Sequence, residues 1–146
     1  ELCALALEPA RHRAAPVALY ALQKLTGDPN AARASAVRLR VSRRCAALLA
    51  PMVLGQRGDL LRSRATDVLL NVSIERGANA ALARATLDPL LLLLDDGDAD
   101  DDARAHATAL LSNLSRDANT RNLVHLRSTS LFHSRAGTTR SRGEYE

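Results

Sequence analysis

The sequence predicts an all-helical protein, and three observations lead to that class. Apolar residues make up 47% of the 146 residues, yet the aromatic residues are only Tyr20, Phe132 and Tyr145. The dominant residue types are alanine, leucine and arginine, which favour helices, whereas strands favour β-branched and aromatic residues. Apolar residues also recur at helical spacing in three separate segments. The length fits about one domain of ~100–200 residues.

The three helical segments share one spacing, with apolar residues at i, i+4, i+7, i+8 and i+11. They are Ala14-Ala18-Ala21-Leu22-Leu25, Leu61-Ala65-Val68-Leu69-Val72 and Ala103-Ala107-Leu110-Leu111-Leu114. This spacing forms one face of an amphipathic helix. Leu61 follows Ala14 by 47 residues and Ala103 follows Leu61 by 42, an interval typical of stacked helical repeats. The first copy is the weakest, because Pro16 suits a first helical turn and leaves Ala14 outside the helix.

Each long helix leads into a polar turn that ends in asparagine, at Asn30, Asn79 and Asn119. An asparagine side chain accepts hydrogen bonds from exposed amides, so we expect these residues to cap the helices that follow. Those short helices are predicted over Ala31–Arg40, Ala80–Ala85 and Thr120–Leu126. Pro89 suits a first helical position, so a separate helix is expected to begin there and continue over Leu90–Leu94.

Two strings at the ends of the later long helices resemble the end of an armadillo third helix. They are Leu69-Leu70-Asn71-Val72-Ser73 and Leu110-Leu111-Ser112-Asn113-Leu114-Ser115-Arg116-Asp117. The resemblance covers roughly residues 12–126. Within that superfamily the strings are most similar to the Hgh-type armadillo co-chaperones, which help a chaperonin fold translation elongation factor two. The resemblance implies a right-handed helical solenoid over residues 1–126, a fragment of about two full units plus partial ones.

Asn71 and Asn113 lie beside the apolar face of their helices, in line with the residues four and seven positions earlier. The three rows formed in this way are Val17-Tyr20-Lys24, Arg64-Asp67-Asn71 and His106-Ala109-Asn113. The armadillo resemblance implies that Asn71 and Asn113 line a concave groove and bind an extended peptide backbone. The alternative is that the asparagine amides bridge neighbouring helices, because buried polar groups need partners in either case.

The resemblance therefore implies a protein or peptide partner, bound without catalysis by a scaffold or co-chaperone. The candidate partner-binding residues are Asn71, Asn113, Lys24, Tyr20, Asp67, Arg64 and His106. Lys24 departs from the family pattern, which has asparagine at this place. Importin-type armadillo proteins carry tryptophan four residues before the asparagine. Here those positions hold Tyr20, Asp67 and Ala109, which argues against recognition of basic nuclear-localisation peptides.

Catalytic, metal-binding and cofactor-binding patterns do not occur in the sequence. The four histidines lack metal-ligand spacing, and neither GxxxxGK nor GxGxxG is present. The acidic run Asp95–Asp102 lacks the glycine and glutamate positions of a calcium-binding EF-hand loop. We interpret it as a solvated loop whose last aspartates favour the positive N-terminus of the next helix. We therefore expect no enzyme activity, no cofactor and no small-molecule substrate.

The charge leaves one alternative function open. The net charge is +4, and all but one of the 20 basic residues are arginine, which permits a nucleic-acid-associated role. Their spread along the chain and the lack of aromatic partners argue against base stacking. A further alternative is a partner-less piece of a larger solenoid, because such folds need three or more repeats and polar caps.

Compartment and chain ends give four more expectations. Cys3 and Cys45 cannot build a disulfide framework, so we expect structural packing in a reducing compartment, the cytoplasm or the nucleus. The longest uncharged apolar run, Pro89–Leu94, is far shorter than the ~18 residues of a membrane span. No signal-peptide pattern opens the sequence. Residues 127–146 have no apolar period and are expected to be a disordered tail.

Overall fold

The computed structural model describes residues 14–54, 60–99 and 101–140, the last ten of these as backbone only. Over these residues the chain is all-helical and contains no strand. The elements are α2 (Ala15–Thr26), α3 (Ala31–Arg44), α4 (Ala46–Leu49), the 3-10 helix η2 (Ala50–Leu54), α5 (Leu60–Ser73), the 3-10 helix η3 (Arg76–Ala78), α6 (Asn79–Asp95), α7 (Asp101–Arg116) and α8 (Ala118–Arg140). The all-α class predicted from composition and spacing is confirmed.

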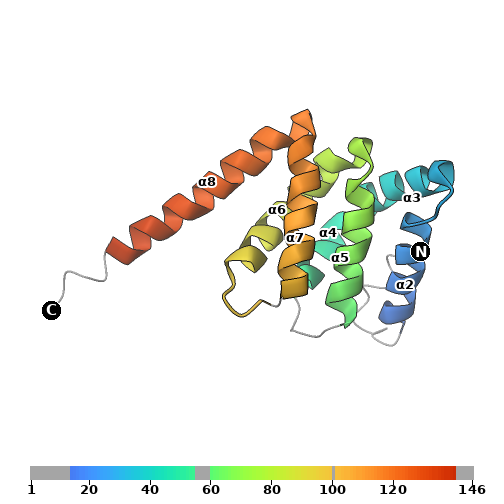
Figure 1. Ribbon diagram of the computed structural model, residues 1–146, viewed down its shortest axis with the longest axis horizontal. Coiled ribbons are helices and arrows are strands. Elements are labelled where there is room, and N and C mark those ends of the chain that lie inside the picture. The colour runs from blue at the N-terminus through green and yellow to red at the C-terminus, as the bar shows by residue number, and fades with distance from the viewer. Residues whose placement is uncertain (1–13, 55–59, 100, 141–146) are drawn as a thin grey trace.

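Helices α2, α5 and α7 form a row in which α5 packs between the other two. They are the three segments that carry the repeated apolar spacing, and they run in the same direction (Figure 1). A second row of helices, made of α3, α4 with η2, α6 and α8, packs behind them. Helix α8 extends away from the rest of the molecule (Figure 1).

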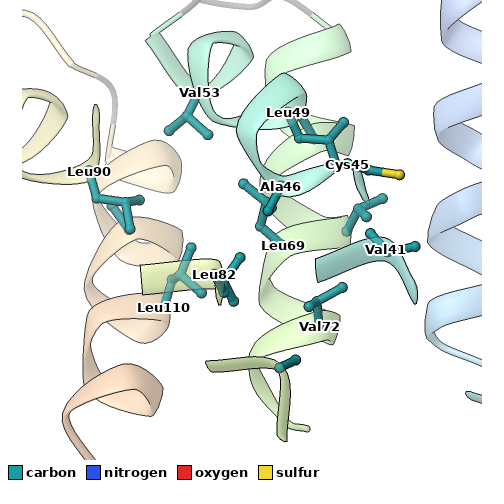
Figure 2. Packing of buried hydrophobic residues seen from close by; sticks show 14 of the residues in the cluster. Val41, Cys45, Ala46, Leu49, Val53, Leu69, Val72, Leu82, Leu90 and Leu110 are labelled. Carbon is teal, nitrogen blue, oxygen red and sulfur yellow. The ribbon is translucent and has the colours of Figure 1, made fainter. Parts of the chain in front are cut away.

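The core lies between the two rows and consists of leucine, valine and alanine side chains. Figure 2 shows Leu69 and Val72 of α5, Leu82 and Leu90 of α6 and Leu110 of α7 in this cluster. Val41 of α3 and Leu49 and Val53 of α4 and η2 complete the other side of the cluster. The amphipathic faces of the long helices therefore supply the core, as their spacing predicts.

The repeated apolar positions are buried to different extents in the three helices. In α5 the last four are fully buried, whereas in α2 Leu25 is 42% exposed. The first copy of the spacing, which the sequence predicts to be the weakest, is therefore also the least buried of the three. In α7 the position of Leu111 is equivalent to that of Leu69, but Leu111 is only partly buried. The shared spacing predicts that both leucines are buried between stacked helices. That is wrong for Leu111, because among the described residues no helix covers the outer side of α7 as α7 covers α5.

Only one of the three predicted asparagine caps is formed. Asn30 precedes α3, and its side chain accepts a hydrogen bond from the amide of Arg33 at 3.2 Å. Asn79 is instead the first residue of α6 and is buried, with Ala78 in the capping position. Asn119 lies inside the first turn of α8, and its backbone N–H donates to the side-chain carboxylate of Asp117 at 2.9 Å. Asp117 thus takes the role expected of Asn119.

Three helices are longer than the sequence predicts, and the first of them, α3, ends at Arg44 rather than Arg40. Helix α6 is continuous and contains Pro89 in its interior, so the predicted break into two helices is wrong. Packing of both halves of α6 against the core overrides the local preference of proline for a first turn. Helix α8 continues past Leu126 to Arg140. The hydroxyls of Ser128 and Thr129 donate to carbonyls within the helix, so these polar side chains do not interrupt it.

Cys45, at the junction of α3 and α4, is buried and takes part in a disulfide. The expectation of a reduced thiol is therefore wrong for this residue, because sequence spacing does not reveal which sulfur atoms approach each other in space. Cys3 lies outside the described residues. None of the helices in the described ranges combines the length and apolar character needed to cross a membrane.

Candidate functional site

We call the contact between two neighbouring long helices of the row a seam. In the seam between α2 and α5, the side chain of Asn71 bridges the two helices. Its amide nitrogen Nδ2 donates to the hydroxyl of Thr26 at 3.3 Å and to the carbonyl oxygen of Gln23 at 3.4 Å. The Thr26 hydroxyl donates its own proton to the carbonyl of Leu22 at 2.8 Å. That hydroxyl can therefore only accept from Asn71, which fixes the orientation of the Asn71 amide.

The seam between α5 and α7 repeats this arrangement one unit later. Nδ2 of Asn113 donates to the hydroxyl of Ser73 at 2.9 Å, and Ser73 donates to the carbonyl of Leu70 at 2.7 Å. Ser73 follows Asn71 by two residues, and Thr26 likewise lies two residues after the equivalent position in α2. Each seam thus joins an asparagine amide to a hydroxyl at the end of the preceding long helix.

A chain of polar side chains crosses all three helices near their middle. Nε2 of Gln23 on α2 donates to Oδ2 of Asp67 on α5 at 2.8 Å. The other oxygen of Asp67 lies 3.6 Å from Nε2 of His106 on α7, with both side chains partly exposed. When His106 is protonated, this contact is an ion pair between the last two helices of the row.

Tyr20, on α2, is the aromatic residue among the candidate partner-binding residues. Tyr20 is 47% exposed, and its ring lies 5.3 Å from Nζ of Lys24 and 5.1 Å from the guanidinium carbon of Arg64. These distances are within the range of cation–π attraction. Arg64 also donates to the carbonyl of Pro16, which orients its guanidinium across the α2–α5 seam.

The structure therefore brings together all seven candidate residues from the sequence, on the face formed by α2, α5 and α7, which we call the seam face. Lys24 and Tyr20 come from α2, Arg64, Asp67 and Asn71 from α5, and His106 and Asn113 from α7. Of the two roles that the sequence leaves open for the asparagines, bridging between helices is observed for both amide nitrogens.

The side-chain carbonyl oxygens of the two asparagines take no part in these bridges between helices. Among the described residues, Oδ1 of Asn71 and Oδ1 of Asn113 accept no hydrogen bond, and both side chains are partly exposed. Each asparagine thus has its donor committed to the fold and an acceptor available to a ligand. Two such acceptors one repeat apart can receive backbone amides of an extended chain.

The sequence reasoning missed the hydroxyls that receive the asparagine amides and the glycine beside one of them. A Cβ atom on Gly27 would lie 3.3 Å from Nδ2 of Asn71 and 3.2 Å from the carbonyl of Gln23, so a side chain here would crowd the bridge. A signal was present, because each long helix carries serine or threonine at the same register, at Thr26, Ser73 and Ser115.

The acidic loop before α7 is organised by one arginine. Arg104 donates to the backbone carbonyls of Asp96, Gly97 and Ala99, while Asp101 and Asp102 lie exposed in the first turn of α7. Within the described ranges, no group of three or more histidine, cysteine or acidic side chains is placed to hold a metal ion. No family model, curated protein or solved structure matches the chain significantly.

Proposed function

We propose that this chain is a segment of a right-handed armadillo-type solenoid that binds a polypeptide partner along its seam face, without enzymatic activity. One observation carries the proposal. The Asn71 and Asn113 bridges repeat the same geometry in successive seams and leave an acceptor oxygen available in each. Acceptor oxygens that recur along the row suit a ligand whose hydrogen-bond donors also recur. An extended peptide is such a ligand, because its backbone N–H groups repeat along the chain.

The charged groups of the seam face suggest what else the partner presents. Lys24 and Arg64 lie beside the exposed Tyr20 ring, and Asp67 lies between Gln23 and His106. An extended segment with an acidic or aromatic side chain at the α2 end fits this arrangement. The resemblance to Hgh-type co-chaperones makes translation elongation factor two the first full-length candidate, which would place the protein in the cytoplasm. The disulfide at Cys45 is unusual for that compartment.

The experiment compares two substitutions that break the same bridge from opposite sides. Asn113→Ala removes the bridge and the acceptor oxygen, whereas Ser73→Ala removes the bridge but leaves the whole Asn113 amide in place. Peptides selected from a phage-displayed library against the wild-type chain, and purified elongation factor two, serve as probes. Binding is measured by fluorescence anisotropy, and stability by thermal unfolding.

We expect both variants to lose similar stability, about 1–3 kcal/mol, because each leaves a partly buried polar group without its partner. Only Asn113→Ala should weaken peptide binding, by tenfold or more. Equal affinities for the two variants would show that Asn113 is purely structural. Failure to select any peptide, together with no binding of elongation factor two, would remove the support for polypeptide recognition at this face.

A second candidate function, nucleic-acid binding, is favoured by the outer surface of α3. Arg33, Arg40 and Arg44 are seven and four residues apart and so lie on one side of this helix, with Arg43 beside them. All four are exposed, α3 contains no acidic residue, and none of the four pairs with a carboxylate among the described residues. Such a cluster can neutralise successive phosphates.

If nucleic acid binds at α3, the salt dependence of DNA binding should change when the arginines of α3 are replaced. Binding of a labelled 20-base-pair DNA duplex is titrated from about 50 to 200 mM salt for Arg40→Gln/Arg44→Gln and for the control Arg84→Gln/Arg116→Gln. The α3 variant should reduce the slope of log K against log salt by about 2, one for each lost phosphate contact, and the control should not. Equal slopes, or no binding at the lowest salt, would exclude α3 as a nucleic-acid surface.

A further inference from the structure

The side of α3, α4 and η2 that faces away from the core is exposed along all three elements. The opposite side of the same stretch is buried, and Figure 2 shows Val41, Leu49 and Val53 in the core cluster, one from each element. Helical hydrogen bonds continue past the junction at Cys45. Its N–H donates to the carbonyl of Val41 at 2.8 Å, and its carbonyl accepts from the N–H of Leu49 at 2.9 Å. The exposed residues of the three elements therefore follow one another on the outer surface of the second row.

This outer surface has a basic half and an apolar half. The basic half lies on α3 and consists of Arg33, Arg40, Arg43 and Arg44. The apolar half follows at once in the chain, on α4 and η2, and consists of Ala47, Leu48, Pro51 and Leu54. All eight residues are exposed, and we call them the outer strip.

The apolar half forms a patch rather than a set of scattered residues. Leu48 and Leu54 are each 47% exposed. Pro51 and Leu54 are three residues apart in the 3-10 helix η2, and residues at this spacing in a 3-10 helix project from the same side. Leu48 lies three residues before Pro51, in the last turn of α4. Both leucines thus project into solvent on the side away from the core.

The basic half carries positive charge that the surrounding protein leaves uncompensated. Helix α3 contains no acidic residue, and none of its four exposed arginines forms an ion pair within the described ranges. An arginine side chain can lay its methylene stem along an apolar surface while its guanidinium reaches a charged partner. The outer strip therefore offers guanidinium groups and exposed leucines side by side.

We propose that the outer strip binds the surface of a membrane that contains anionic lipids. The arginines contact the lipid headgroups, and Leu48 and Leu54 enter the boundary between headgroups and acyl chains, so the chain lies on the membrane without crossing it. Charge complementarity with apolar contact favours this partner over nucleic acid. Phosphates of DNA match only the arginines and leave the leucines in water, whereas a lipid surface accepts both halves. This inference does not depend on peptide binding at the seam face.

Binding to vesicles, measured by co-sedimentation, tests the apolar half. The wild type should bind phosphatidylcholine vesicles that contain phosphatidylserine far more tightly than vesicles of phosphatidylcholine alone, because the arginines need anionic lipid. Leu48→Ser/Leu54→Ser should weaken this binding at least tenfold, since it removes the apolar contact. The control Val17→Ser/Leu25→Ser removes two exposed apolar residues from α2, in the first row, and should leave it unchanged.

Replacing arginines tests the basic half and separates lipid from nucleic acid. Arg43→Gln/Arg44→Gln should weaken vesicle binding about 25-fold, because each basic residue near an anionic membrane contributes about fivefold. The control Lys24→Gln/Arg116→Gln removes two exposed charges from the first row and should weaken it much less. The serine variant of the two leucines should keep its affinity for a labelled DNA duplex, since phosphate contacts come from the arginines. DNA binding without vesicle binding would overturn the proposal and leave nucleic acid as the ligand of α3.

A tryptophan in the outer strip gives a readout that does not rely on lost binding. The sequence contains no tryptophan, so the single indole of Leu54→Trp reports its own surroundings. Its fluorescence should shift to shorter wavelength when anionic vesicles are added, because the ring enters the membrane interface, and that of Leu25→Trp should not. Circular dichroism melts check that each variant folds. An unshifted Leu54→Trp, a wild type that ignores anionic vesicles, or leucine and control variants that bind equally well would each overturn the proposal.

Discussion

Shortening Leu69 to alanine should lower the free energy of unfolding by about 2–5 kcal/mol, as for other fully buried leucines. Leu69 is 0% exposed in α5, the helix that packs between α2 and α7. The substitution removes apolar contacts within the core cluster and leaves a cavity that the surrounding helices fill only in part by relaxing. Urea unfolding followed by circular dichroism measures the change.

The same substitution at Leu111 is the matched control. It occupies the equivalent position of the next repeat but is only partly buried, so Leu111→Ala should cost about 1 kcal/mol or less. Losses of equal size at the two positions would contradict the difference in packing between α5 and α7. A negligible loss at Leu69 would mean that the repeated apolar face is not the core.

Replacing Pro89 with alanine should stabilise the protein by about 1–3 kcal/mol. Proline in a helix interior is about 3 kcal/mol less favourable than alanine, because it removes an amide donor and crowds the preceding turn. Pro89 lies inside the continuous helix α6, where its missing amide leaves the carbonyl of Ala85 without the usual helical partner. Lost ring contacts and greater unfolded-state freedom reduce the gain below the full value.

Thermal unfolding of Pro89→Ala measures this gain, with Leu92→Ala as the control. Leu92 lies in the same helix and is 48% exposed, so its substitution should change stability by less than about 0.5 kcal/mol. A lower melting temperature for Pro89→Ala would show that the proline ring, or a bend that it introduces, is needed for α6 to pack against the core.

The parts of the fold that follow from periodicity were predictable from the sequence. Helices α2, α5 and α7 are the three segments with the repeated apolar spacing, and four of the five repeated positions of α5 are fully buried. The extent of α6 was not predictable, since the local signal at Pro89 favours a helix start and only packing against the core overrides it. Local signals also failed at Asn79, where burial in the second row outweighs the preference for a cap.

The candidate site was predictable as a set of residues but not as a set of contacts. Spacing along each helix placed Asp67 and Asn71 on one flank, and the structure keeps them there. Which atoms meet across a seam depends on how far one helix slides along the next. The sequence of a single helix does not show how far that helix is shifted along its neighbour. The pairing of Asn113 with Ser73 therefore had to come from the structure.

The seams also bear on how the chain folds. Their hydrogen bonds join residues 40 to 48 positions apart, always between one long helix and the next. No such bond in the described residues connects the first long helix with the last. A chain built from nearest-neighbour contacts folds and unfolds by steps along its length. Helix α5, held on both sides, should be the last to open, and exchange of backbone amide protons with solvent should begin at the ends of the row.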